Sequence, residues 1–101
     1  MTKEQIISAI VPILQEHGVT KAALFGSLAR GDATDRSDVD LLVNFEEGRT
    51  LLDLIGLRQE AASLLGRDVD VVTYDSIHPR FRANVLREQE VIYEAVAADI
   101  S

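Results

Sequence analysis

Cysteine is absent from the 101-residue sequence, which excludes disulfide bonds and thiolate metal sites and is ordinary for a protein of a reducing cytosol. No apolar run approaches the roughly 18–20 residues needed to span a bilayer. No hydrophobic segment of a signal peptide follows the N-terminal Met. We therefore expect a soluble, cytoplasmic protein without a membrane contact.

Basic charge is also scarce, since 10 Lys and Arg face 17 Asp and Glu and leave a net charge of −7. A general nucleic-acid binder needs a basic face to displace counterions from phosphates, and no Lys/Arg run supplies one. We expect no direct nucleic-acid binding. An acidic balance suits solubility, a basic partner or a site for divalent cations, and charge alone does not choose among these.

The length fits one small domain over residues 1–101 and leaves no room for a second. Apolar residues make up 47% and charged residues 27% of the sequence, as in ordinary globular proteins. A domain this small buries a smaller share of its surface than a larger one. It therefore gains more than most from a ligand, a metal or a partner.

Two segments carry the spacing and the end signals of helices. Thr2 to Gln5 has the form of a capping box, and apolar residues follow at helical spacing until the stop at Gly18. Pro12 lies inside this helix and should kink it or shift its start. A second helix is predicted from Thr50 to Leu65, with Gly66 as its stop. Its apolar stripe consists of Leu54, Leu57, Ala61 and Leu64.

Apolar and alternating runs predict strands, which are Ala22–Phe25, Asp38–Phe45 and Asp68–Tyr74. Residues 26–37 between the first two are rich in turn formers, with one helical turn at Ser27–Arg30. Asp75 and Ser76 are expected to cap a helix that begins near Pro79. Periodicity leaves the segment from Val91 to Ala98 open between strand and helix. The order of elements predicts a single α/β or α+β layered structure.

Asp38 and Asp40 are the first residues with a chemical pattern. Side chains at i and i+2 of a strand point to the same face, so both carboxylates would project together. Two anions that close repel each other and raise each other's pKa unless a positive charge lies between them. Mg²⁺ answers this need because it takes hard oxygen ligands and keeps positions open for water and phosphates.

Asp70 repeats the pattern with Asp68 on another strand. If this strand pairs beside Asp38–Val43, Asp70 completes a cluster of three carboxylates suited to a two-metal mechanism. Solvated acids on an edge strand explain each Asp-x-Asp pattern equally well when it is taken alone.

Gly26 and Ser27 follow a predicted buried strand and open a short helix. A helix start presents backbone N–H groups and here a hydroxyl, which together receive phosphate. Gly26 would allow close approach of the backbone, Ser27 would bond a phosphate oxygen, and Arg30 could add a charged donor. An ordinary β-turn is the simpler explanation of a Gly-Ser pair by itself.

Taken together, these pieces form a long constrained pattern. The run GSLARGDATDRSDVDLLVNF resembles the signature of the DNA polymerase beta-type nucleotidyltransferase superfamily, and most closely that of the small prokaryotic minimal nucleotidyltransferase (MNT) domains. The later segments RDVDVVTYD and EQEVIYEA resemble the family's third-carboxylate strand and its C-terminal strand. The likeness covers nearly the whole chain, without a departure at a functional position.

The resemblance implies a polymerase beta-like fold, in which a small mixed β-sheet is flanked by helices. It implies Mg²⁺, with two ions expected, held by Asp38, Asp40 and Asp70, and Asp70 as the general base toward the acceptor hydroxyl. By the same resemblance Gly26 and Ser27 hold the terminal phosphates of the nucleotide. The acceptor oxygen would attack the α-phosphorus in line, and pyrophosphate would leave.

Small MNT proteins are similar to antitoxins encoded beside HEPN-domain toxins, which they bind and adenylylate on a tyrosine. This likeness suggests that the chain transfers AMP from ATP to such a toxin. Two alternatives remain open from the sequence. One is a non-catalytic antitoxin that occludes its partner, and the other is a nucleotidyltransferase acting on a small molecule, which would be expected to carry a further substrate domain.

Overall fold

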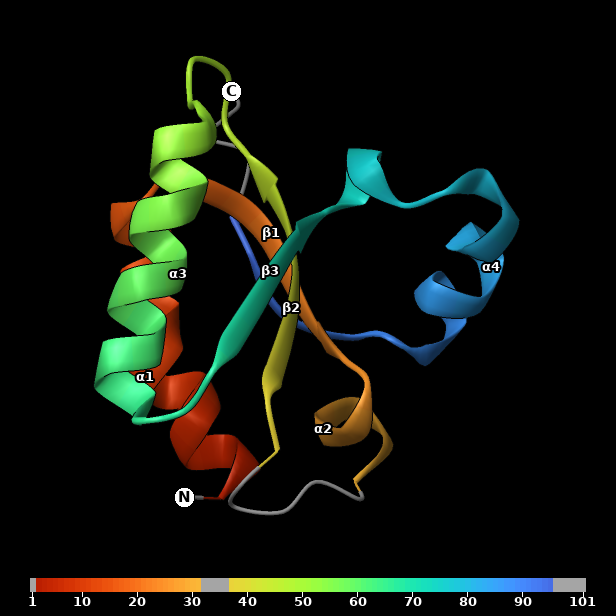
Figure 1. The fold of residues 1–101 in the computed structure, drawn as a ribbon, viewed down its shortest axis with the longest axis horizontal. Helices are drawn as coiled ribbons and strands as arrows, with labels where there is room; N and C mark the ends of the chain where they lie inside the picture. The colour runs from red at the N-terminus through yellow and green to blue at the C-terminus, as the bar shows by residue number, and fades with distance from the viewer. Residues whose placement is uncertain (1, 32–36, 96–101) are drawn as a thin grey trace.

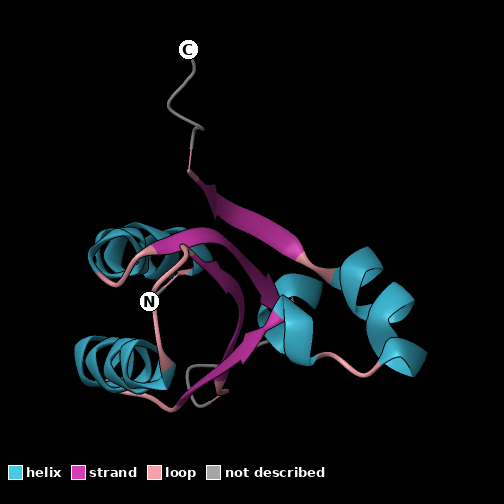
Figure 2. Cartoon of the chain, turned by 90° about the horizontal axis from the view of Figure 1, so that it is seen from above, coloured by secondary structure: helices cyan, strands magenta, loops and turns pink. Residues whose placement is uncertain are grey.

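The computed structural model describes residues 2–31 and 37–95, which form a four-stranded sheet flanked by helices (Figure 1). Seen from above, α1 and α3 lie on one side of the sheet, and α2 and α4 lie on the other (Figure 2). The helices are α1 (Lys3–Glu16), α2 (Ser27–Arg30), α3 (Leu51–Leu65), the 3-10 helix η1 (Tyr74–Ser76) and α4 (Pro79–Glu88). The strands are β1 (Val19–Phe25), β2 (Val39–Phe45), β3 (Val69–Thr73) and β4 (Glu90–Glu94). The predicted class, a small mixed sheet with flanking helices, is confirmed.

Helix α1 begins where its capping box predicts. The hydroxyl of Thr2 accepts from the backbone N–H of Gln5 at 3.1 Å, and Gln5 Oε1 accepts from the backbone N–H of Thr2 at 2.8 Å. The helix contains Pro12 and ends before Gly18, whose φ is +78°. Of the two effects predicted for Pro12, the shifted start does not occur.

Helix α3 has the predicted ends but a different buried face. Thr50 caps its start and Gly66, in the left-handed conformation, follows its end. Its buried residues are Leu57, Ala61 and Leu65. Leu64, predicted to lie on this stripe, is 55% exposed, so that prediction was wrong. Leu64 and Leu65 both lie within about one turn of Ala61, and packing on the sheet selects Leu65.

The sheet has the strand order β3-β2-β1-β4. β1 is antiparallel to both of its neighbours, β2 and β4, whereas β2 and β3 are parallel and are connected through α3. The register places Asp40 opposite Phe25 on one side and opposite Asp70 on the other. The end of β1 and the starts of β2 and β3 therefore meet at the same end of the sheet.

The main core lies between the sheet and the helices α1 and α3, and its largest fully buried side chains include Ile6, Ile10, Leu14, Leu24, Leu41 and Leu57. A smaller cluster on the opposite face contains Ala23, Leu42 and Tyr74, with Val85 of α4 packed against it. Tyr74, predicted as a strand residue, instead begins η1, and its hydroxyl donates to Gln89 Oε1 at 2.5 Å. Two clusters thus support the sheet from both faces.

One helix cap predicted in the C-terminal third of the chain is wrong. Helix α4 begins at Pro79 as predicted, but its cap is His78, whose Nδ1 accepts from the backbone N–H of Arg80 at 3.1 Å. Asp75 and Ser76 belong to η1 and do not cap α4. Pairing with β1 makes 91–94 a strand, while residues 96–98 of the predicted segment lie outside the described residues. Each helix in the described part of the chain is too short or too polar to cross a membrane.

Candidate active site

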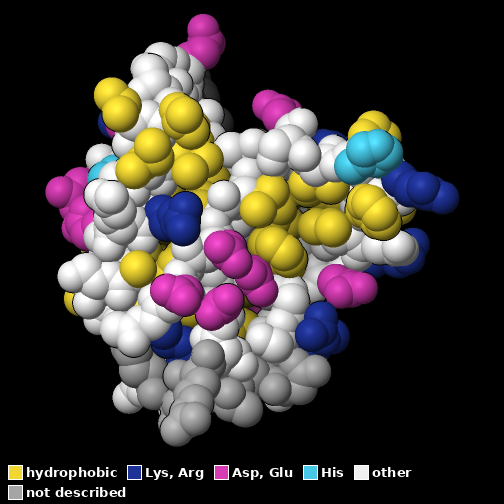
Figure 3. All heavy atoms as spheres, viewed as in Figure 1, with side chains coloured by type: hydrophobic (Ala, Val, Ile, Leu, Met, Phe, Trp, Pro, Cys, Tyr) yellow, Lys and Arg dark blue, Asp and Glu magenta, His cyan; other side chains and the backbone are white. Residues whose placement is uncertain are grey.

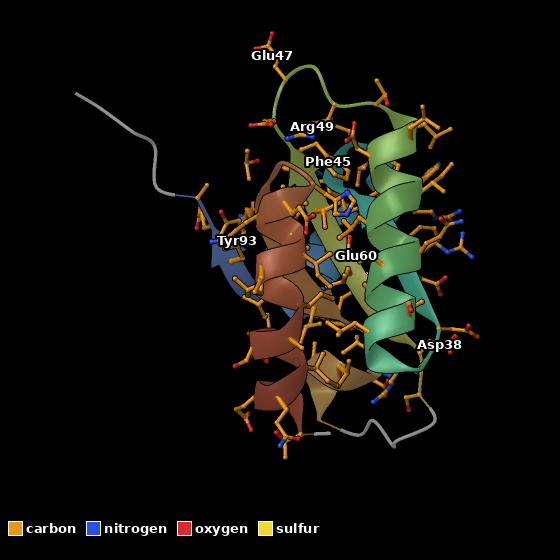
Figure 4. The ribbon with its side chains drawn as sticks, turned by 90° about the vertical axis from the view of Figure 1, so that its left-hand side faces the viewer. Asp38, Phe45, Glu47, Arg49, Glu60 and Tyr93 are labelled. Carbon is orange, nitrogen blue, oxygen red and sulfur yellow. The ribbon has the colours of Figure 1, made fainter. Side chains whose placement is uncertain are left out.

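Three carboxylates lie at the starts of two neighbouring strands, at one end of the sheet. Asp40 of β2 is the register partner of Asp70 of β3, and Asp38 immediately precedes β2. Because side chains alternate along a strand, Asp38 and Asp40 share the face opposite the buried Val39. Figure 3 shows acidic side chains gathered on one part of the surface, and Figure 4 shows Asp38 at the end of the sheet far from Phe45. The pairing of the two Asp-bearing strands, a condition left open by the sequence, is present in the structure.

Burial and like charge act together on Asp40, which is half-buried, whereas Asp38 and Asp70 are exposed. Burial raises the pKa of Asp40 above its usual value, the negative charges of Asp70 and Asp38 raise it further, and Arg30 opposes the rise. At Asp40, burial and the neighbouring negative charges therefore outweigh the opposing effect of Arg30. Such a group of carboxylates attracts a cation that prefers oxygen ligands.

The carboxylate side chains do not yet converge on a single point. Among residues 2–31 and 37–95, no three Asp, Glu or His side chains are grouped closely enough to hold a metal ion. The fold therefore brings Asp38, Asp40 and Asp70 to neighbouring backbone positions, and rotation of their side chains would be needed for common coordination.

The turn after β1 places its backbone against Asp40. Gly26 has φ +71° and ψ −145°, a conformation that is nearly confined to glycine. A Cβ at this position would lie 2.5 Å from Asp40 Oδ2. Gly26 is thus needed both for the backbone conformation and for the close approach to the carboxylate.

Ser27 and Arg30 are the first and last residues of α2, and the buried Leu28 between them holds this short helix on the core. The guanidinium of Arg30 lies 3.9 Å from Glu88 Oε1 of α4, and its charge acts on Asp40. The predicted nucleotide-binding residues are therefore on the segment that follows β1, beside the predicted carboxylates.

One residue that orders this region was missed in the sequence. Arg67 donates to the carbonyl oxygen of Ser37 from Nε at 2.9 Å and from Nη2 at 2.6 Å. The backbone N–H of Val39 donates to the carbonyl of Asp68 at 2.9 Å. These bonds hold the turn between α3 and β3 against the residues that flank Asp38. A single Arg beside a helix stop carries no sequence signal of this role.

A hollow beside the edge strand β3 connects the carboxylates with α3. Its walls include Asp38, Asp68 and Asp70 on one side and Ile55, Arg58 and Gln59 on the other. Two of the three predicted carboxylates therefore face space that is open to solvent and bordered by α3.

Comparison with known proteins identifies the family. The family "Polymerase beta, Nucleotidyltransferase" matches residues 8–97. The chain belongs to this family. Protein adenylyltransferase MntA from Thermococcus cleftensis is 43% identical to this nucleotidyltransferase over 91 residues, which cover 89% of this chain and 90% of the relative.

Solved structures place this nucleotidyltransferase among minimal members of the family. A structure provisionally described as a minimal nucleotidyltransferase matches it with a TM-score of 0.78 and 44% identity, over 89% of this chain and 95% of the other. A chain from a mutant of the toxin–antitoxin complex MntA-HpeT matches with a TM-score of 0.72 and 26% identity, over 87% of this chain and 72% of the other. The minimal nucleotidyltransferase fold expected from the sequence is confirmed.

Proposed function

We propose that this nucleotidyltransferase transfers AMP from ATP to a tyrosine hydroxyl of a HEPN-domain toxin and thereby acts as its antitoxin. The observation that carries the proposal is the pairing of Asp40 with Asp70 on neighbouring strands, with Asp38 just before β2 and Gly26 against Asp40. Similarity to a protein adenylyltransferase supports a protein acceptor, and similarity to a chain of a toxin–antitoxin complex supports a toxin as that acceptor.

The donor set fits Mg²⁺ in its chemistry. Asp38, Asp40 and Asp70 offer hard carboxylate oxygens, and burial together with the charges of Asp70 and Asp38 raises the pKa of Asp40, an effect that a bound cation would oppose. We assign two Mg²⁺ ions to these three residues. Bound ions would polarise the phosphate oxygens and neutralise the charge that develops during transfer.

The remaining steps are assigned to the chain's own groups. The backbone at Gly26 and the hydroxyl of Ser27 hold the terminal phosphates of ATP, and Arg30 supplies a charged donor. Asp70 takes the proton of the acceptor hydroxyl as its oxygen forms a bond to the α-phosphorus. The bond from the α-phosphorus to the bridging oxygen breaks in line, and pyrophosphate leaves with that electron pair.

The proposal also covers the domain organisation and the cellular location of the chain. Residues 1–101 would act as one domain, because a single sheet takes strands from residue 19 to residue 94. The cytoplasm would supply its ATP, and a cysteine-free chain suits that reducing compartment.

The test uses a HEPN-domain protein as the acceptor. After incubation with the chain, ATP and Mg²⁺, its intact mass should rise by one AMP or a multiple of it. The double variant Asp38→Asn/Asp40→Asn should abolish the gain, while Asp75→Asn, an exposed aspartate of η1, should leave it unchanged. No gain under conditions in which the two proteins bind would remove the catalytic claim. If the double variant still neutralises the toxin in full, the chain acts instead by covering its partner.

A further inference from the structure

We propose that an exposed apolar surface at the start of α3 is the docking site for the acceptor protein, a proposal that rests on the proposed function. Leu51 and Leu52 are 70% and 78% exposed, and Ile55 is 39% exposed. Their spacing of three and four residues places them together on one face of the helix. These three side chains are called the α3 patch below.

The α3 patch continues into an apolar groove between α3 and the sheet. Besides the polar residues Arg49, Thr50, Thr73 and Ser76, the groove is lined by Leu51 together with Phe45, Leu54, Val71 and Val72. The last two belong to β3, which is an edge strand of the sheet. Contiguous exposed apolar surface of this kind marks an interaction site more often than scattered single side chains do.

The α3 patch also borders the carboxylates. Ile55 lines the hollow that Asp38 and Asp70 line, and Arg58, one turn further along α3, lines it too. In Figure 3 apolar side chains cover the upper part of α3, and acidic side chains lie below them on the same face. Leu51 is only about 6 Å along the helix axis from Ile55. A protein that places a hydroxyl at Asp70 would therefore lie beside Ile55, within reach of the rest of the α3 patch.

The occupant that fits is an acceptor protein with an apolar surface next to its reactive hydroxyl. Arg58 is exposed at the border between the patch and the acidic residues, so a carboxylate of the acceptor would complement it. An apolar centre with charged groups at its rim is the usual composition of such interfaces. A membrane or a polyanion would leave either the leucines or the acidic border without a complementary surface.

The same helix supplies a matched control. Leu64 is 55% exposed, but it lines a separate hollow with Pro12 and Ile13 of α1. Alanine at Leu51, Leu52 or Leu64 removes exposed apolar surface and keeps a residue that favours helix. The unfolding temperature should therefore stay close to that of the wild type in each variant.

The test measures AMP transfer to the same HEPN-domain protein at several concentrations of that protein. Leu51→Ala/Leu52→Ala should raise the KM for the HEPN-domain protein by about tenfold, since truncation of an interface anchor weakens binding by about that factor. The value of kcat and the KM for ATP should not change, and Leu64→Ala should behave as wild type. An unchanged KM for the acceptor, or an equal rise in the KM for ATP, would overturn the proposal.

Two further measurements separate this proposal from the proposed function. If the wild type binds the HEPN-domain protein but transfers no AMP, the proposed function fails. Calorimetry then still tests the α3 patch, with a tenfold weaker complex expected for Leu51→Ala/Leu52→Ala and none of this loss for Leu64→Ala. Sedimentation of the chain alone tests whether a second copy of the chain occupies the α3 patch instead. A dimer of the wild type that the double variant loses would assign the patch to a second copy, against the proposal.

Discussion

Gly26 occupies a position at which any side chain would strike the carboxylate beside it. Its φ of +71° and ψ of −145° are strained for other residues, and a Cβ would lie 2.5 Å from Asp40 Oδ2. Because that oxygen ends a side chain that can rotate, the clash would turn Asp40 away from the site. The constraint therefore concerns the geometry of the carboxylate as well as the stability of the turn.

We expect Gly26→Ala to abolish AMP transfer while costing about 1–3 kcal/mol of the free energy of unfolding. Gly66→Ala is the control, because Gly66 also has a positive φ, +67°, but a Cβ there would meet nothing within 4 Å. It should lose about 1–2 kcal/mol of stability and keep its transfer activity. Urea unfolding and the transfer assay measure both quantities. Equal losses of activity in the two variants would show that backbone strain alone is responsible.

Asp40 is expected to serve the site at a cost to stability. Burial and the charges of Asp70 and Asp38 raise its pKa above 3.8, so the folded chain holds this proton more tightly than the unfolded chain. The free energy of unfolding then falls as pH rises through the raised pKa, and the loss is absent below 3.8, where both states are protonated.

Asp40→Asn should therefore be more stable than the wild type in neutral, metal-free buffer, and this difference should disappear in acid. Urea unfolding at both pH values measures it, with the exposed Asp75→Asn as the control. A wild type that is as stable as Asp40→Asn at neutral pH would contradict the electrostatic account.

At the scale of elements, local signals predict where helices begin and end. Thr2 and Thr50 start their helices through bonds within one turn, and Gly66 ends α3 through its own backbone conformation. Features that depend on residues distant in the sequence cannot be predicted from these local signals. Packing decides that Leu65 is buried in place of Leu64, and pairing with β1 decides that 91–94 is a strand.

The same distinction between local signals and distant interactions applies to the candidate site. The spacing of Asp38 and Asp40 places them on one face of a strand from the sequence alone. That Asp70 lies opposite Asp40 depends on the parallel pairing of β2 with β3, which the sequence allowed but did not require. The family resemblance implies that the three carboxylates share one site, but it does not give this pairing. The contact of Arg67 with Ser37 joins residues 30 positions apart, and no periodicity reveals it.

Arg67 is accordingly expected to act as a positioning residue that joins two elements. Arg67→Met removes both hydrogen bonds to the Ser37 carbonyl and should lower the free energy of unfolding by about 1–3 kcal/mol. Because Ser37 precedes Asp38, kcat for AMP transfer should also fall, and Arg67→Lys should restore part of it. Arg80→Met, at an exposed position of α4, is the control. Wild-type kcat in Arg67→Met would exclude the positioning role.

At the scale of the whole molecule, charge is distributed unevenly. The net charge is −7, yet Arg80, Arg82 and Arg87 gather on the single helix α4, which has no buried residue. The acidic groups of the site lie at the neighbouring starts of β2 and β3. A small chain that gathers carboxylates at its proposed site can gain stability when cations and nucleotide bind there.

Saturation with Mg²⁺ and ATP should therefore raise the unfolding temperature. A ligand at 100 times its Kd adds about 2.7 kcal/mol to the free energy of unfolding. For a chain of about 100 residues this corresponds to a rise of at least about 10 °C. ATP with a chelator should give a much smaller rise, and Asp38→Asn/Asp40→Asn should respond weakly to both mixtures. Differential scanning calorimetry measures the shift. An equal rise with and without Mg²⁺ would show that the nucleotide binds without the carboxylates, and the assignment of the metal site would then be wrong.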